Sequence, residues 1–158
     1  MKAKLLALCL LLAALPTVVL AEKGDREKPI NVEADRVSID DIKKVQVFEG
    51  NVVLIQGTLQ LRTSKLVVTQ DADGFQKGVA TGNPAKFKQK REGRDDYVEG
   101  IALRIEHNAK TEKTELYDKA WVKSGQDEVK GAYISYEAPT EKYLVTNTNG
   151  GTKSATEI

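Results

Sequence analysis

A strand-turn-strand phrase returns along this chain, and the repeat limits the fold more than any other feature of the sequence. The first copy, FEGNVVLIQGTLQL, begins at Phe48 and alternates apolar and polar residues around two glycines. Weaker copies contain GNPAKF, from Gly82, and YDKAWV, from Tyr117. Intervals of 32 and 36 residues separate Gly50, Gly82 and Asp118, as expected when one supersecondary unit is copied along an axis. The sequence therefore predicts a stack of similar β-hairpins.

Alternation with a period of two extends over most of the chain after residue 28, and this period is typical of strands. The clearest strand runs are residues 30–34, 45–48, 59–61, 101–105 and 133–136. Turn-forming residues cluster at 39–42, 70–74, 91–95, 124–127 and 138–141. Pro84 cannot donate to a ladder, so we expect a bulge or a strand start there. The pattern predicts at least eight short strands in an antiparallel all-β fold.

The first 21 residues have the pattern of a cleaved secretory signal peptide. Lys2 and Lys4 precede an apolar run, and Val19-Leu20-Ala21 is a small-residue cleavage site, so we expect the mature chain to start at Glu22. A membrane anchor is the competing interpretation, but the uncharged stretch is shorter than the roughly 20 residues that span a bilayer.

Export and composition together exclude several classes of protein. The one cysteine, Cys9, lies within the predicted signal peptide, so we expect no disulfide in the exported chain. Loss of Lys2 and Lys4 leaves 22 basic residues against 23 acidic ones. This balance argues against a nucleic-acid partner.

The mature chain divides into three parts in this interpretation. Residues 22–28 form a flexible N-terminus, residues 29–146 form one β domain, and residues 147–158 form a disordered polar tail rich in Asn, Gly, Ser and Thr. Removal of the apolar signal peptide leaves relatively few apolar residues, which predicts a thin or partly open interior. The strands near Ile30 and near residues 143–146 are the expected open edges, and an open edge can recruit another chain.

Catalytic and metal sites are not predicted. His107 is the only histidine, so a serine-histidine triad or a zinc site would depend on this residue alone. The segment Asp71-Ala72-Asp73-Gly74 resembles the start of a calcium loop, but no glutamate follows at the required spacing. We therefore predict a protein that is not an enzyme and that binds no cofactor or metal.

The nine aromatic side chains allow two interpretations. They belong either to a filled β core or to an apolar groove that accepts the acyl chains of an amphipathic ligand. In the second case, the basic side chains near these strands would meet anionic groups at the rim of the groove. These side chains are Lys65, Lys86, Lys88 and Arg104.

Five short motifs together resemble the OstA-like (LptA) family of periplasmic lipopolysaccharide-transport proteins. They are INVEAD at 30–35, FEGNV at 48–52, QG at 56–57, GNPAKF at 82–87 and VEG at 98–100. Their order and spacing are more specific than any single motif, and the resemblance covers about residues 29–146. The chain departs from the family pattern at Asp118-Lys119-Ala120, where a third G-N-A phrase would stand.

The resemblance implies a fold, a ligand and partners. The fold is a twisted, incompletely closed β-jellyroll of stacked antiparallel hairpins, and its hydrophobic channel holds the lipid A acyl chains of lipopolysaccharide. Members of the family join head to tail. They also pair with the OstA-like domains of an inner-membrane transporter component (LptC-like) and of an outer-membrane translocon (LptD-like), which forms a bridge between the two membranes.

The predicted function is that of a non-enzymatic lipopolysaccharide carrier and bridge in the periplasm. The alternative is a periplasmic β domain that scaffolds envelope proteins by strand addition, with a filled core and no lipid. Alternation within each run gives the side chains expected to line the lipid groove. They are Ile30, Val32, Leu59, Leu61, Phe87, Leu103, Ile105, Trp121, Ile134 and Tyr136.

Overall fold

The chain folds into antiparallel strands, as a computed structural model shows for residues 24–25, 27–91, 93–137, 139–140, 142–147 and 156–157. The strands are β1 (Asn31–Glu33), β2 (Arg36–Asp40), β3 (Val45–Gln56), β4 (Leu59–Asp71), β5 (Gly74–Lys90), β6 (Tyr97–Asn108), β7 (Lys113–Ser124), β8 (Asp127–Glu137), β9 (Lys142–Thr146) and β10 (Thr156–Glu157). The predicted all-β, incompletely closed jellyroll of stacked hairpins is confirmed.

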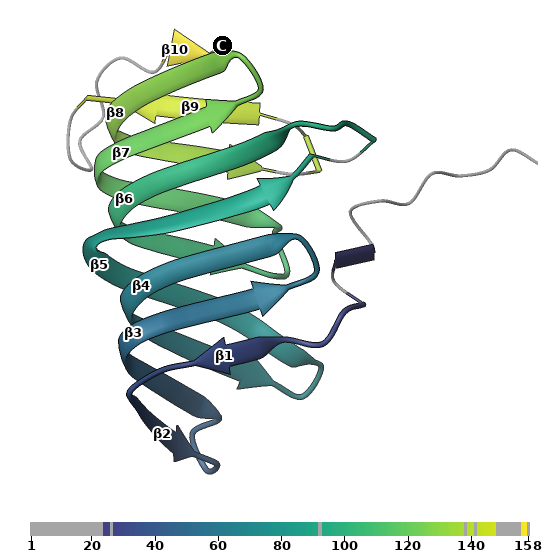
Figure 1. Cartoon of the computed structure of the whole chain (residues 1–158), viewed down its shortest axis with the longest axis vertical. Coiled ribbons are helices and arrows are strands. Elements are labelled where there is room, and N and C mark those ends of the chain that lie inside the picture. The colour runs from purple at the N-terminus through teal and green to yellow at the C-terminus, as the bar shows by residue number, and fades with distance from the viewer. Residues whose placement is uncertain are drawn as a thin grey trace, which may run out of the picture.

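The strands follow one another in space in the order in which they occur along the chain. From β3 to β9 each strand pairs with the next, so consecutive hairpins stack along one axis (Figure 1). β1 and β2 are both paired with β3, β1 through Val53–Ile55 and β2 through Val45–Glu49. The two short strands therefore cover one edge of the sheet, and β9 with β10 lies at the opposite end.

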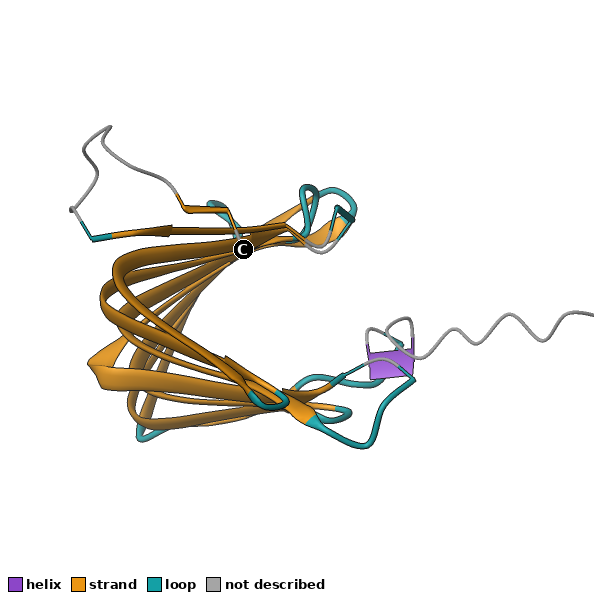
Figure 2. Ribbon diagram, turned by 90° about the horizontal axis from the view of Figure 1, so that it is seen from above, coloured by secondary structure: helices purple, strands orange, loops and turns teal. Residues whose placement is uncertain are grey.

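A bend crosses the middle of the sheet. Every pairing from β3 to β8 changes register near its centre, and such bulges bend a strand and increase its twist. Gly50 and Asn51 of β3 have positive φ angles of 77° and 47°, and Asp118 and Lys119 of β7 have 63° and 53°. Seen from above, the sheet forms two arms that meet at this bend and separate toward their turns (Figure 2).

The bends coincide with the repeated phrase of the sequence. They lie at Gly50-Asn51 in β3, between Thr81 and Ala85 in β5, and at Asp118-Lys119 in β7. The repeat is therefore confirmed, and each copy supplies an odd-numbered strand with its bulge. The bulge expected at Pro84 is confirmed as well.

The hydrophobic core lies on one face of the folded sheet, which we call the inner face. Its buried apolar residues are Phe48, Val52, Leu66, Ala80, Ala85, Ala102, Ile105, Leu116, Ala120, Val122 and Ile134. The four alanines flank the register shifts of β5, β6 and β7. Side chains this small allow the two arms to approach each other where the sheet bends.

The predicted domain boundaries stay predictions. The predicted signal peptide, residues 1–21, lies outside the described residues, as do 148–155 and 158 of the predicted tail. Within that tail, Thr156–Glu157 is paired with Leu144 and Val145 of β9. At the other end, Asp25 and Lys28 contact the hairpin that joins β3 to β4. None of the helices formed by the described residues is long and apolar enough to cross a membrane.

Candidate functional site

The inner face carries apolar side chains from the bend toward the turns, and these side chains become more exposed away from the bend. Side chains beside the bend are buried, whereas those nearer the turns are only partly buried and pack against the core. These partly buried residues are Val32, Ala34, Leu54, Leu61, Val68, Phe87, Val98, Val129, Tyr143 and Val145. The two arms separate on one side of the bend (Figure 2). The partly buried apolar residues therefore line the arms on the side where they separate.

The inner face is also uncovered at the N-terminal edge of the sheet. Val37 is opposite Phe48 in the β2–β3 pair, so both side chains point to the inner face, and alternation places Ile39 there too. Val37 is 49% exposed and Ile39 is 59% exposed. Ile30, which precedes β1, is 49% exposed. An apolar face that reaches an open strand edge is suited to continue into another module.

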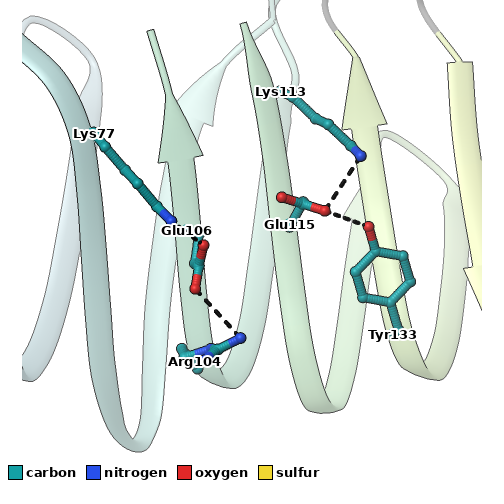
Figure 3. Close-up of polar contacts among 6 residues, drawn as sticks. All are labelled: Lys77, Arg104, Glu106, Lys113, Glu115 and Tyr133. Atoms are coloured by element: carbon teal, nitrogen blue, oxygen red, sulfur yellow. Dashed lines mark hydrogen bonds and ion pairs between the residues drawn. The ribbon is translucent and has the colours of Figure 1, made fainter. Parts of the chain in front are cut away.

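The opposite, outer face carries ion pairs that cross the strands. Lys77 Nζ of β5 lies 2.6 Å from a carboxylate oxygen of Glu106 in β6, and the other oxygen lies 3.3 Å from Arg104 Nη2 (Figure 3). The Arg104 guanidinium also lies over the ring of Tyr117, 4.1 Å from its centroid. Both basic side chains of this group are therefore paired with one carboxylate within the sheet.

A second outer-face group centres on Glu115 of β7. Its carboxylate accepts hydrogen bonds from the Tyr133 hydroxyl at 2.5 Å and from Lys113 Nζ at 3.2 Å (Figure 3). Partial burial alone would raise the pKa of Glu115, but the bonds from Tyr133 and Lys113 outweigh it and hold that pKa below its ordinary value. Burial and the bond to Glu115 raise the pKa of the Tyr133 hydroxyl.

Comparison with known proteins decides the family. The sequence profile described as "LptA/(LptD N-terminal domain) LPS transport protein" matches residues 31–142. The chain belongs to this family. The resemblance found in the sequence motifs is thereby confirmed.

Relatives from three bacteria support the assignment to the LptA/LptD N-terminal domain family. The lipopolysaccharide export system protein LptH of Pseudomonas aeruginosa is 31% identical over 143 residues, which are 90% of this chain and 79% of that protein. LptA of Escherichia coli K12 is 31% identical over 147 residues, 92% of this chain and 78% of that protein. LptA of Haemophilus influenzae is 31% identical over 153 residues, 91% of this chain and 88% of that protein.

A solved structure agrees with the fold of this LptA-family chain. The crystal structure of LptH, described as the LptA homologous periplasmic component of the lipopolysaccharide transport device from P. aeruginosa, superposes with a TM-score of 0.75 at 26% identity. The match covers 85% of this chain and 97% of the LptH chain.

Five of the ten predicted lining residues belong to the apolar inner face of this LptA-family chain. Ile105 and Ile134 are buried in the core, and Val32, Leu61 and Phe87 are partly buried against it. Each of the five comes from a different strand, namely β1, β4, β5, β6 or β8, and the fold brings them to one face.

Three more predicted lining residues lie at the borders of that face. Tyr136 stacks on Tyr143 of β9 with ring centroids 4.5 Å apart, and Tyr143 packs against the core. Leu59 is partly exposed at the start of β4, and Ile30 is half-exposed before β1.

The prediction that Leu103 and Trp121 line the inner face is wrong. Ala102 and Ile105 are both buried, so the register shift between them turns Leu103 outward, where it lines an outer cavity of about 550 Å³. Trp121 lies between the buried residues Ala120 and Val122 and therefore points to the outer face. Two adjacent bulged residues change the phase of alternation, which a count along the sequence does not reveal.

The basic residues expected at the rim lie on the outer face instead. Lys65 Nζ is 3.1 Å from Glu49, and Lys88 Nζ is 3.1 Å from Glu99. Lys86 lies next to the inner-face residue Phe87, so it also points outward. Lys65 and Lys88 are thus each paired with a glutamate across the strands of the outer face.

Several inner-face residues were missed by the sequence reasoning. Leu54 lies within the continuous apolar run VVLI, which carries no phase of alternation, and Val98 and Val129 stand alone among polar neighbours. The turn position would have predicted the face of Leu54. The two-residue turn at Gly57-Thr58 places Leu54 opposite Leu61, so both side chains lie on the same face.

The residues considered for catalysis or metal binding have structural partners. His107 Nδ1 lies 3.0 Å from Thr114 Oγ1, and its ring stacks on Phe75 at 6.2 Å. Asp71 forms an ion pair with Lys110 at 3.0 Å. Across the described ranges, no three His, Cys, Asp or Glu side chains gather to hold a metal ion.

Proposed function

We propose that this protein is a periplasmic lipopolysaccharide-binding carrier that passes lipopolysaccharide from the inner to the outer membrane along its apolar inner face. The observation that carries the proposal is the exposure of that face, which is closed at the bend, partly exposed toward the turns and uncovered at the N-terminal edge. Membership of the LptA/LptD N-terminal domain family supports the choice of ligand.

The physical task is to keep acyl chains out of water, which needs no chemical step. Each methylene that leaves water contributes about 0.8 kcal/mol, so a molecule with several acyl chains crosses an aqueous space very slowly unaided. An apolar face along the whole stack removes that barrier. Because neighbouring hairpins offer similar burial, movement along the stack changes the free energy little, and an energy-consuming partner must set its direction.

We propose that the bridge forms by head-to-tail strand addition. The β1–β2 edge would pair with the C-terminal edge strands of a second copy. The same edges would join OstA-like domains of an inner-membrane transporter component and of an outer-membrane translocon. This arrangement is favoured because the exposed inner-face residues Ile30, Val37 and Ile39 lie at that edge, so joining two sheets would also continue the apolar face.

Site-specific photo-crosslinking to lipopolysaccharide tests the proposal. A photoreactive residue at Phe87 or Leu61, both partly buried on the inner face, should capture lipopolysaccharide in cells. The matched control is Leu103, an apolar residue of the outer face, which should capture none. Equal capture at Phe87 and Leu103 would contradict an inner-face path. A lack of capture at both inner positions would favour the scaffolding alternative, in which no lipid is bound.

A further inference from the structure

The edge strand β1 is held at both ends by an aspartate that fits against a glycine. β1 has only three residues, and it pairs with Val53–Ile55 of β3. That stretch of β3 lies between Gly50 and Gly57, whose φ angles are +77° and +57°. Three paired residues provide few ladder bonds, so additional contacts are needed to keep such a strand in place.

The first contact group lies where β1 ends. The Asp35 backbone N–H donates to the Gly50 carbonyl at 2.9 Å, and Asn51 Nδ2 donates to Asp35 Oδ2 at 2.8 Å. A Cβ atom at Gly50 would overlap the Asp35 carboxylate. Gly50 therefore has two roles: it adopts the positive φ angle at the bend of β3, and its lack of a side chain leaves room for the Asp35 carboxylate.

The second contact group lies ahead of β1. Asp25 Oδ1 accepts from the Thr58 backbone N–H at 2.8 Å, and Asp25 Oδ2 accepts from Thr58 Oγ1 at 2.5 Å and from Gln89 Nε2 at 3.1 Å. A Cβ atom at Gly57 would overlap this carboxylate too. Burial alone would raise the pKa of Asp25, but the hydrogen bonds from Thr58 and Gln89 outweigh it and lower that pKa.

The segment between Asp25 and β1 is fastened as well. The Lys28 backbone N–H donates to the Asp25 carbonyl at 3.1 Å, and the Lys28 carbonyl accepts from Gln56 Nε2 at 3.2 Å. The chain thus enters β1 from a fixed point beside the β3–β4 turn and leaves it at a fixed point beside the bend.

We propose that Asp25 and Asp35 are positioning residues that hold β1 in place as the template onto which a strand of a second copy of this chain adds. The inference rests on the end-to-end assembly proposed above and assigns two residues to it. Ordering the edge before the encounter removes the entropy cost of fixing it during binding, and such preorganisation strengthens association without new contacts.

An exchange of the Asp35–Asn51 pair tests the inference. Asn51→Asp places two carboxylates against each other, which breaks the contact, whereas Asp35→Asn combined with Asn51→Asp restores a donor and an acceptor. Asp25→Ala tests the second contact group. Asp73→Ala, which removes an exposed carboxylate from the β4–β5 turn, is the matched control.

Three measurements are made on the mature full-length protein. Amide hydrogen exchange of residues 31–33, recorded on dilute monomer, reports whether β1 is held. Sedimentation gives the dissociation constant of self-association, and a photoreactive residue at Asn31 reports whether copies meet at β1. We expect Asn51→Asp and Asp25→Ala each to accelerate exchange and weaken association about ten-fold, and the double exchange to restore both within about two-fold.

The outcomes separate this inference from the assembly itself. Unchanged exchange in both single variants would overturn the holding role, and faster exchange with unchanged association would overturn the positioning role. A parent protein that gives no cross-link between copies at Asn31 would overturn the end-to-end assembly and the partner assigned to β1. The exchange result would then still decide whether the two aspartates hold the strand.

Discussion

At the scale of single residues, neighbouring side chains on one strand have opposite surroundings. Leu116 is 1% exposed on the inner face, whereas its neighbour Glu115 is hydrogen-bonded on the outer face. Because of this division, the contribution of the outer face to stability should depend on pH, and that of the inner face should depend on side-chain volume. A prediction for each face follows from these contacts.

Replacement of Glu115 by Gln should reduce stability in a pH-dependent way. Because the pKa of Glu115 is lowered in the folded state, its stabilising effect is complete above the ordinary glutamate value of 4.5 and is lost as the pH falls through the lowered value. We expect Glu115→Gln to cost about 1 kcal/mol near neutral pH and progressively less below pH 4.5. Urea unfolding over this pH range measures the difference, with exposed Asp127→Asn as the control. A cost independent of pH would contradict this account.

Substitution of Gly100 by Ala should disturb the inner face. Gly100 is buried opposite Phe87 in the β5–β6 pair, and a Cβ atom there would overlap the Phe87 ring. We expect a loss of about 1–3 kcal/mol because the ring must leave its position. Gly78→Ala is the control, since a Cβ atom there meets Phe75 at an ordinary 3.4 Å, and it should be nearly neutral in urea unfolding. Equal stability of the two variants would exclude this packing role for Gly100.

At the scale of the elements, the bulge is the feature that each repeat preserves. Gly50-Asn51 and Asp118-Lys119 differ in sequence but share a pair of left-handed conformations at equivalent places in β3 and β7. Glycine and asparagine adopt this conformation readily, whereas lysine pays a steric cost of about 1 kcal/mol. The fold therefore holds the β7 bulge against the preference of Lys119.

The substitutions Asp118→Gly and Lys119→Asn together should stabilise the protein. They give the β7 bulge the two residues found in the β3 bulge, and the relief of backbone strain should contribute about 0.5–1 kcal/mol. Thermal unfolding measures the gain, and Lys123→Asn, in an ordinary part of β7, serves as the control that should give none. A lower melting temperature for the double variant would show that the native pair makes contacts that outweigh the strain.

The sequence predicted the elements better than their faces. Turn residues and the phrase around Gly50 were sufficient to predict the hairpins, because both act through local backbone preference. The faces of Leu103 and Trp121 were not predicted, because two-residue bulges reset the alternation without a composition signal of their own. The contact of Asp25 with Gly57 joins residues 32 positions apart, and no local sequence pattern predicts such a contact.

At the scale of the whole molecule, the stack has two different ends. The N-terminal end is made of two short strands with half-exposed apolar side chains, whereas at the other end Tyr143 and Val145 of β9 are partly buried. Different ends favour head-to-tail joining over symmetric pairing, since an edge of one kind meets an edge of the other.

Loss of apolar surface at the N-terminal end should weaken assembly without unfolding the monomer. Val37→Ser with Ile39→Ser removes two half-exposed inner-face side chains, and we expect the dissociation constant of self-association to rise about ten-fold or more. Ile42→Ser is the control, because Ile42 is 96% exposed in the β2–β3 turn. Sedimentation equilibrium measures the change. An effect as large for Ile42→Ser would place the contact at the turn.

Because the hairpins stack in chain order, the length of the molecule can change independently of its width. Each further hairpin would add two strand spacings, roughly 9–10 Å, to the long axis and leave the bent profile as it is. Insertion or deletion of one whole repeat would thus change the length of the stack and leave its cross-section unchanged. Duplication or loss of one repeat within the gene therefore provides a direct evolutionary route to a protein fitted to a wider or a narrower gap.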